Sequence, residues 1–244
     1  MKTPQEIAQA LIAVGETFGT DELFPTVVPE AYEFVSTDPY AFVIAVCLDR
    51  GTKAEIIWTI PYDMRQELGH LDPAVIHEMS LEDLAELFAR LPRRPRYVHD
   101  APRTIKDLTQ IVVEECAGDA TRIWEGKRAA EIKHTLLSIF GVGPGIANMG
   151  VLLIKANFGI IFDDLDRKKM DIKPDVHTRR VLYRLGLADE QTNIAAIVAT
   201  RIMRPEYPGE LDGALWWIGR EWCFATAPDC AHCPMETDCV KNID

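Results

Sequence analysis

Four cysteines near the C-terminus carry the most specific chemical signal in this chain. They are Cys223, Cys230, Cys233 and Cys239, with the spacing C-x6-C-x2-C-x5-C. Four thiolates so close in sequence bind zinc, hold an iron–sulfur cluster or form two disulfides. Only one pair has the C-x2-C spacing of a zinc knuckle, whereas structural zinc sites more often contain two such pairs set well apart. Spacing alone therefore favours a cluster and zinc about equally.

A second candidate for chemistry is Asp175, within the segment P-D-V-H-T-R-R that begins at Pro174. The apolar residues that follow predict a helix over 176–186. An aspartate directly before a helix usually acts as an N-cap, accepting backbone N–H bonds of the first turn. Taken alone, the segment therefore predicts a cap at Asp175 and a structural first-turn role for His177.

A third feature is a glycine-rich turn between two helical patterns, at 127–140 and 144–158. The turn reads G-V-G-P-G from Gly141 to Gly145, and its proline suits the first position of the second helix. Bare amides ahead of a helix N-terminus can receive a phosphate. Most such turns are only compact connections between helices. Both interpretations stay open on this evidence.

The elements that position these residues are predicted to be helices, and we expect an all-α fold. No alternating apolar pattern or hairpin signal predicts a strand. Residues 20–37 are expected to be irregular. Helices are expected at about 4–19, 39–48, 53–69, 72–78, 80–91, 99–117, 127–140, 144–158, 176–186, 189–203 and 209–224.

Composition limits the class of protein. The chain of 244 residues is 48% hydrophobic and 26% charged, which is ordinary for a soluble globular protein. No apolar run has the length of a membrane span, and the N-terminus does not resemble a signal peptide. Because four of the six cysteines are crowded together, we expect a reducing cytoplasm and a metal group. Cys47 and Cys116 are expected to be buried core residues.

Charge is unevenly distributed along the chain. The net charge is −12, although nucleic-acid-binding proteins usually show a basic surface. Residues 1–50 have a net charge of −6, whereas residues 167–184 carry seven Lys or Arg against two Asp. Residues 93–106 form a second basic segment. Such runs are usually solvated helix faces, and they predict a phosphate-binding face only if the fold brings them together.

Taken in order, the three features resemble the helix-hairpin-helix DNA glycosylases of the endonuclease III superfamily. The segment 139–147 resembles the hairpin of that family, and 175–177 resembles the segment that carries its catalytic aspartate. Gly219-Arg-Glu-Trp-Cys223 and the cysteine run are similar to its [4Fe–4S] loop. The resemblance covers most of the chain, more loosely before residue 99.

The resemblance implies two helical domains that flank a DNA-binding cleft. A six-helix barrel with the helix-hairpin-helix would span 37–159, and residues 1–36 and 160–244 would form a discontinuous iron–sulfur domain. The four cysteines would hold a [4Fe–4S] cluster. The implied partner is duplex DNA with a damaged or mismatched base flipped into the cleft. The protein would act as a monomer in the cytoplasm, at the nucleoid, without a membrane.

The resemblance also implies roles for individual residues. Asp175 would be the catalytic residue that stabilises positive charge on the sugar. Arg50 would fill the gap left by the flipped base, and the hairpin amides would hold a phosphate. The implied DNA contacts are Arg50, Gly141, Val142, Gly143, Gly145, His177, Arg179 and Arg180.

One departure from the family bears on the type of reaction. Bifunctional members carry a lysine just after the hairpin glycines, and its amine forms a Schiff base with the sugar. That position falls on Gly145 or Ile146 here. The chain is therefore expected to be a monofunctional glycosylase. Alternatives are a lyase with a relocated lysine (Lys168, Lys169 or Lys173), a non-catalytic DNA-binding relative, and a zinc-stabilised interaction protein.

Overall fold

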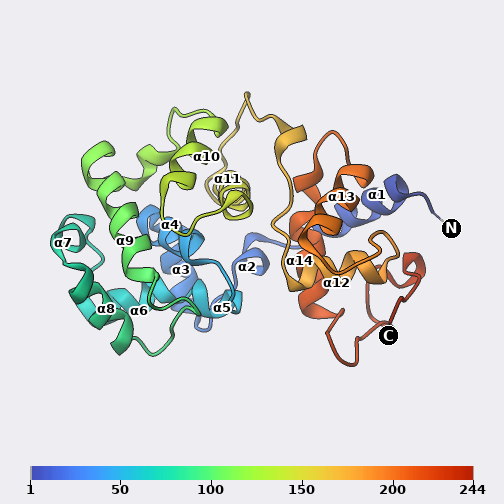
Figure 1. Ribbon diagram of the computed structural model, residues 1–244, viewed down its shortest axis with the longest axis horizontal. Helices are drawn as coiled ribbons and strands as arrows, with labels where there is room; N and C mark the ends of the chain where they lie inside the picture. Colours follow the sequence, from blue (N-terminus) through green and yellow to red (C-terminus); the bar gives the residue numbers. More distant parts are fainter. Residues whose placement is uncertain (1, 244) are drawn as a thin grey trace. The chain divides into compact units, whose positions relative to one another are not determined.

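The computed structural model describes residues 2–243, and the chain forms two compact helical units (Figure 1). The central unit is Phe24–Leu165, and the terminal unit joins Met1–Leu23 to Asp166–Asp244. The described residues form helices, turns and irregular loops and contain no strand. The predicted all-α fold class is confirmed.

The central unit begins earlier in the chain than residue 37, where the sequence predicted its start. Phe24 is fully buried and packs against the rings of Tyr32, Phe42 and Trp58, with centroid distances of 5.5, 5.6 and 4.8 Å. The expectation of an irregular segment over 20–37 was wrong. This segment forms α2 (Thr20–Leu23) and α3 (Pro29–Thr37), because a proline at a first helical position begins α3.

The central unit contains nine α-helices, and α4 among them is buried at every position from Tyr40 to Leu48. The helix has no polar face because its neighbours cover it on all sides. The helices of this unit are α3 (Pro29–Thr37), α4 (Pro39–Leu48), α5 (Ala54–Ile57), α6 (Ile60–Leu68), α7 (Pro73–Glu78), α8 (Leu81–Arg90), α9 (Ala101–Gln110), α10 (Ala129–Ser138) and α11 (Pro144–Phe158).

Local sequence signals set several of these boundaries. Ser80 and Asp83 form the predicted capping box of α8: the Asp83 N–H donates to Ser80 Oγ at 3.0 Å, and the Ser80 N–H donates to Asp83 Oδ2 at 2.9 Å. The single helix expected over 53–69 is instead α5 and α6, separated at Trp58 and Thr59. Pro61 lies in the first turn of α6, where it fits a helix start better than a helix interior.

Helix α9 continues into a π-helix, Ile111–Glu115, followed by a 3-10 turn, Ala120–Ile123. The chain then reaches α10 and α11, which contact each other and are joined by residues 139–143 (Figure 1). This pair is the predicted helical hairpin.

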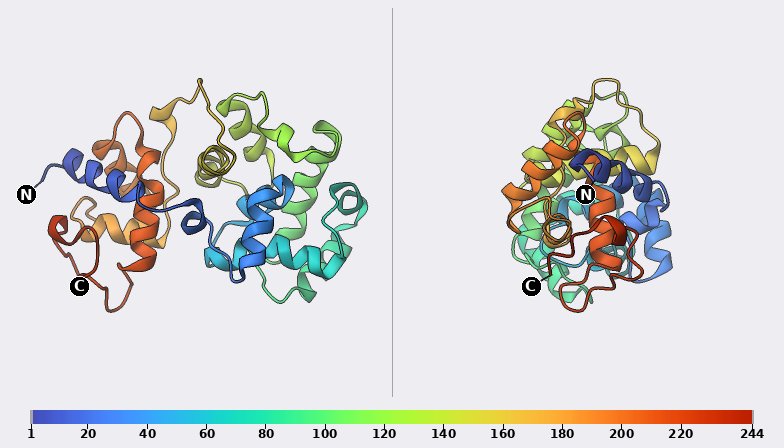
Figure 2. Two further views of the ribbon diagram at one scale, coloured as in Figure 1. Left: turned by 180° about the vertical axis from the view of Figure 1, so that it is seen from behind. Right: turned by 90° about the vertical axis from the view of Figure 1, so that its right-hand side faces the viewer.

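The terminal unit joins the two ends of the chain around one core. Its helices are α1 (Pro4–Gly15), α2 (Thr20–Leu23), α12 (Val176–Arg184), α13 (Asn193–Met203) and α14 (Asp212–Glu221), with 3-10 turns at Arg167–Lys169, Pro208–Leu211 and Glu236–Asp238. Helix α1 packs beside α13 and α14 (Figure 2). Leu11, Leu182 and Leu215 are fully buried in this core, against which the cysteine segment packs.

No single described helix is both long enough and apolar enough to cross a membrane. The pair α3 and α4 meets the length and composition test together, but it is bent by 107°. Since α4 is buried throughout, its hydrophobicity reflects a core position in the central unit.

Candidate functional site

Asp175 is the N-cap of α12 in the terminal unit, as the sequence predicted. Its Oδ1 accepts the backbone N–H groups of His177 at 2.8 Å and Thr178 at 2.9 Å. The Thr178 hydroxyl accepts the Asp175 N–H at 2.9 Å and completes a capping box. The other carboxylate oxygen, Oδ2, makes no hydrogen bond within residues 2–243. One oxygen of this half-buried side chain is therefore fixed, and the other is available for chemistry.

Arg179 lies on the accessible side of the same helix. Its Nε donates to the Asp175 carbonyl at 2.9 Å, and its Nη1 donates to Asn193 Oδ1 at 3.2 Å. The side chain is half-buried and has no carboxylate partner among the described residues. Arg179 can therefore reach a phosphate, and its DNA contact stays a prediction.

Arg180 has different surroundings, because it is only 8% exposed. It donates to the carbonyl oxygens of Val176 at 3.1 Å, Gly219 at 2.7 Å and Cys223 at 2.5 Å. Burial lowers the pKa of Arg180, while the neighbouring Cys223 opposes that shift. We therefore assign Arg180 to holding α12 against the end of α14 and not to direct contact with DNA.

His177 lies where α12 and α14 come closest. A Cβ added to Gly219 would be 2.6 Å from His177 Cβ and 2.9 Å from His177 Cα, so only glycine permits this approach. The imidazole packs edge-on against Trp216, with ring centroids 6.1 Å apart. The Arg220 guanidinium covers the Trp216 ring at 5.4 Å. An aromatic and cationic cluster therefore stands beside the start of α12.

The four cysteines share one small hollow of the terminal unit. Its lining consists of Arg184, Trp222, Cys223, Pro228, Asp229, Cys230, Cys233, Glu236, Cys239, Lys241 and Ile243. Burial raises the pKa of Cys233 and Cys239, and the neighbouring thiols raise it further. Four half-buried thiols that line one hollow fit a multi-iron group that takes one thiolate at each iron. Among residues 2–243, no three or more His, Cys, Asp or Glu side chains converge tightly enough to hold a single ion.

Arg184 anchors the cysteine segment to α12. Its Nη1 lies 3.4 Å from Cys223 Sγ and donates to the Phe224 carbonyl at 2.6 Å. Its Nη2 donates to the Ala225 carbonyl at 3.0 Å. The Arg184 carbonyl accepts a hydrogen bond from the Cys239 S–H, with the sulfur 3.1 Å away. A cation against a thiolate stabilises the ionised sulfur that an iron group requires. Sequence reasoning did not identify this residue.

The hairpin turn of the central unit presents free backbone amides. Gly141 has φ +84°, a left-handed conformation that favours glycine, and Gly143 is the N-cap of α11. The N–H groups of Gly141, Gly143 and Gly145 donate to no acceptor in the described part of the chain. Val142, in contrast, is buried, and its N–H donates to the Ile139 carbonyl at 3.1 Å. Three amides at the start of a 15-residue helix can bind an anion.

Arg50 lies against this turn. Its Nη1 donates to the Gly141 carbonyl at 3.3 Å, and its Nη2 pairs with Asp100 at 3.4 Å. The guanidinium covers the ring of Tyr97 at 5.0 Å, and that ring is 44% exposed. The structure thus brings Arg50 and the hairpin glycines together, within the central unit. Tyr97 is a neighbour that the sequence analysis missed.

Most cations of the basic segment 93–106 have local structural partners. Arg93 forms a bidentate pair with the buried Asp63, and Arg103 covers the Phe140 ring at 4.2 Å. Lys106 donates to the Met79 carbonyl at 2.9 Å. This segment therefore supplies fewer free charges for phosphate than its composition suggested.

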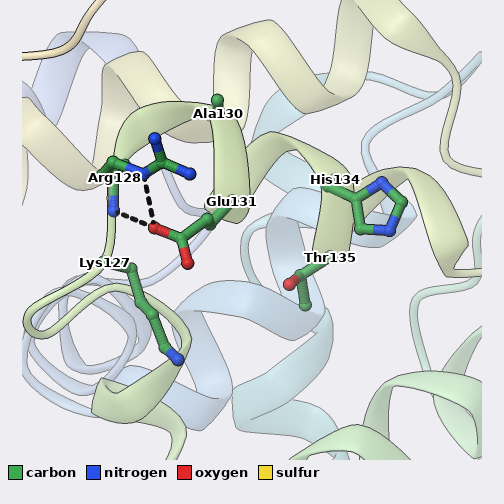
Figure 3. A pocket seen from close by; sticks show the side chains of 6 residues that line it. All are labelled: Lys127, Arg128, Ala130, Glu131, His134 and Thr135. Carbon is green, nitrogen blue, oxygen red and sulfur yellow. Dashed lines mark hydrogen bonds and ion pairs between the residues drawn. The ribbon is translucent and has the colours of Figure 1, made fainter.

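An open hollow of about 330 Å³ lies on the first hairpin helix, α10 (Figure 3). It is lined by Lys127, Arg128, Ala130, Glu131, His134 and Thr135. Arg128 is engaged with Glu131, whose Oε2 accepts its backbone N–H at 3.0 Å and its Nε–H at 3.1 Å. The only carboxylate of this hollow is therefore paired, and we assign no chemistry to it.

No protein-family model matches the chain. Endonuclease III of Bacillus subtilis (strain 168) is 23% identical over 214 residues, which cover 86% of this chain and 84% of that protein. The chain is therefore similar to endonuclease III over most of its length. The resemblance inferred from the hairpin, Asp175 and the cysteine run is thus confirmed.

Three solved structures share the fold of this chain. Two endonuclease III–DNA complexes, a trapped covalent intermediate and a non-covalent complex, are each 20% identical and cover 99% of this chain and 97% of their own. Their TM-scores are 0.63 and 0.64. A thermostable thymine-DNA glycosylase is 15% identical, with a TM-score of 0.56 over 98% of this chain and 95% of its own. Members of the endonuclease III family generally carry a [4Fe–4S] cluster.

Proposed function

We propose that this protein is a DNA glycosylase of base excision repair that hydrolyses the bond between a damaged or mismatched base and its sugar. The observation that carries the proposal is the Asp175 carboxylate, with Oδ1 held by the start of α12 and Oδ2 left without a described partner. The relatives support the same class of reaction, since they include endonuclease III and a thymine-DNA glycosylase.

The chemistry follows from the charge that develops on the sugar. As the C1′–N bond breaks, its electron pair leaves with the base and positive charge builds on C1′ and the ring oxygen. A negative carboxylate fixed nearby stabilises that charge. Water then adds at C1′ and gives its proton to Asp175 acting as general base. The products are a free base and an abasic site in an uncut strand.

The monofunctional reaction is supported by the residue type at the start of α11. The position where bifunctional relatives carry the attacking lysine falls on Gly145 or Ile146 by the resemblance, and neither residue has an amine. The relocated-lysine alternative depends on the segment before Asp175 that contains Lys168, Lys169 and Lys173. Lys169 there pairs with Asp166 at 2.9 Å, and this contact raises the pKa of the amine, which disfavours the neutral nucleophile.

We propose that Cys223, Cys230, Cys233 and Cys239 hold a [4Fe–4S] cluster, and the shared hollow supports this assignment. When bound, the cluster would act as a structural crosslink of a segment with little core of its own. Arg180 and Arg184 would connect this segment to α12 through their bonds to Cys223 and its neighbours.

We propose duplex DNA as the partner, bound in the cytoplasm by one copy of the chain. The hairpin amides would receive a backbone phosphate, with Arg50 beside them and Arg179 contacting a phosphate from the terminal unit. These contacts explain how an acidic protein can bind DNA, because they require local cations and amides and not a high net charge.

The decisive experiment is base release from a panel of duplexes, each with one damaged base or mismatch. Wild-type protein should release at least one base and leave a strand that breaks only after alkali or heat. Asp175→Asn should bind the same duplex without releasing the base. Binding without release by both proteins, over the whole panel, would support the non-catalytic DNA-binding alternative.

A further inference from the structure

The hydrogen-bond state of His177 can be deduced from its contact with Arg180. Arg180 Nη2 lies 3.2 Å from His177 Nδ1. A guanidinium has five N–H donors and no acceptor, and it keeps its charge in proteins. The imidazole nitrogen in this contact must therefore be the acceptor. His177 Nδ1 accordingly carries no hydrogen, and the ring hydrogen sits on Nε2.

Arg180 cannot easily turn away to permit the other tautomer. Three carbonyl oxygens, from Val176, Gly219 and Cys223, fix its guanidinium in a buried position. The backbone of His177 is fixed as well, because Gly219 touches it at a distance that no larger residue allows. A hydrogen on Nδ1 would face an N–H of a buried cation and leave both donors unsatisfied.

We propose that Arg180 holds His177 as a neutral Nε2–H tautomer, whose N–H donates to an acceptor oxygen of the nucleotide on which Asp175 acts. The inference rests on the proposed glycosylase function for the identity of that nucleotide. His177 Nε2 makes no hydrogen bond to a residue between 2 and 243, so its N–H is available. His177 is then a DNA contact, and Arg180 is a positioning residue.

A neutral donor suits this place because of the charges around it. Asp175 is two residues away and must keep its negative charge to stabilise the sugar cation. Arg180 contacts the ring, and Arg220 covers the ring of Trp216, against which His177 packs edge-on. A third cation at His177 would weaken the field of the carboxylate, whereas an uncharged N–H supplies a directed hydrogen bond without that effect.

Neutron diffraction from crystals of the cluster-loaded protein tests the tautomer directly, without DNA or activity. Deuterium should appear on His177 Nε2 and not on Nδ1. Deuterium on Nδ1, alone or together with Nε2, would overturn the proposal. This result does not depend on the glycosylase function, so a failure of one can be distinguished from a failure of the other.

Two substitutions of His177 test the donor. In His177→Gln the side-chain amide reaches the position of Nε2 and keeps an N–H there, whereas the shorter amide of His177→Asn replaces only Nδ1. Affinity for a duplex with a stable abasic-site analogue should be near wild type for Gln. It should fall about two- to tenfold for Asn, the value of one neutral hydrogen bond. Equal losses in both variants would refute the donor role.

The salt dependence of binding separates a neutral donor from a cation. A neutral N–H releases no counterion from DNA, so His177→Asn should lower affinity equally at all salt concentrations. A slope shallower by about one unit, as for a lost phosphate–cation contact, would refute the proposal. Duplexes with single methylphosphonates around the lesion identify the oxygen. If the difference in affinity between His177→Gln and His177→Asn disappears when one phosphate is replaced, that phosphate supplies the acceptor oxygen. If the difference persists with every replaced phosphate, the acceptor is a sugar or base oxygen.

A double-mutant cycle tests whether Arg180 acts through His177. Arg180→Met should lower DNA affinity in the wild-type background and cost little more in His177→Gln, which needs no tautomer control. Equal losses in both backgrounds would mean that Arg180 is only structural. Because Arg180→Met also removes three backbone contacts, Arg180→Lys serves as a second variant that keeps a cation and a donor.

Discussion

The guanidinium of Arg50 lies against the backbone of Gly141, with Nη1 donating to the Gly141 carbonyl at 3.3 Å. The contact joins the loop after α4 to the hairpin turn, 91 residues further along the chain. A Cβ at Gly141 would overlap the guanidinium, and φ at this position is +84°. The left-handed backbone therefore favours glycine at this position, and a Cβ here would also displace the end of the Arg50 side chain.

A comparison of Gly141→Ala with Gly118→Ala should separate the effect of the left-handed backbone from the effect of displacing Arg50. Both glycines have φ +84°, but nothing lies within 4 Å of a Cβ at Gly118. Each substitution should lower the free energy of unfolding by about 1–2 kcal/mol, the cost of a left-handed alanine. Urea unfolding measures this cost. Only Gly141→Ala displaces Arg50, and only this variant should lose DNA affinity, which an equal loss in both would contradict.

Asp175→Asn should lower the rate of base release on the order of 10²-fold or more, because it removes the charge that stabilises the sugar cation. DNA affinity and thermal stability should change little, since asparagine caps a helix about as well as aspartate. Single-turnover base release measures the rate. Asp72→Asn is the matched control, because Asp72 caps α7 through the same kind of bond and has no proposed role in catalysis. Similar rates of base release in Asp175→Asn and Asp72→Asn would mean that Asp175 acts only as a helix cap.

Borohydride should trap no covalent adduct between the wild-type protein and substrate DNA, because no amine stands at Gly145. Gly145→Lys should produce a trapped adduct if this position faces the sugar as in bifunctional relatives. Gel electrophoresis under denaturing conditions detects the adduct. Trapping by the wild type would favour the relocated-lysine alternative, and single substitutions of Lys168, Lys169 and Lys173 would identify the amine.

Freshly purified protein should be brown and contain about four irons per chain. Cys233→Ser should reduce soluble yield before it alters base release, because the cluster organises a segment with little core of its own. Iron analysis and the visible absorption band check both statements. Cys47→Ser is the matched control, because Cys47 is fully buried in α4 of the central unit and is not one of the four grouped cysteines, so iron should be unchanged. Stoichiometric zinc without iron would refute the cluster.

Arg179→Ala should make the salt dependence of DNA binding shallower by about one unit, the change expected for one lost phosphate contact. Arg122→Ala is the control, because Arg122 is an exposed arginine that belongs to no proposed DNA contact. Fluorescence anisotropy at several salt concentrations gives both slopes. An unchanged slope for Arg179→Ala would place this residue away from the phosphates, bonded only to Asp175 and Asn193.

Sequence alone established the all-helical class, the hairpin, the cap at Asp175 and the four grouped thiols. These features depend on residues close to one another in the chain. The capping box at Ser80 and Asp83 forms within three residues, and Asp175 caps the helix that follows it directly. Such signals can be read locally, because helix termini are satisfied by their nearest side chains.

Only the tertiary structure decided what the long cationic side chains do. Arg179 and Arg180 are adjacent and look equivalent in sequence, but Arg180 is buried against carbonyl groups 39 and 43 residues away. Arg184 reaches the cysteine segment, and Arg93 is held by Asp63. A guanidinium can satisfy its donors with phosphate, carboxylate or backbone oxygen. Which of these it meets depends on elements distant in sequence, and folding alone brings them together.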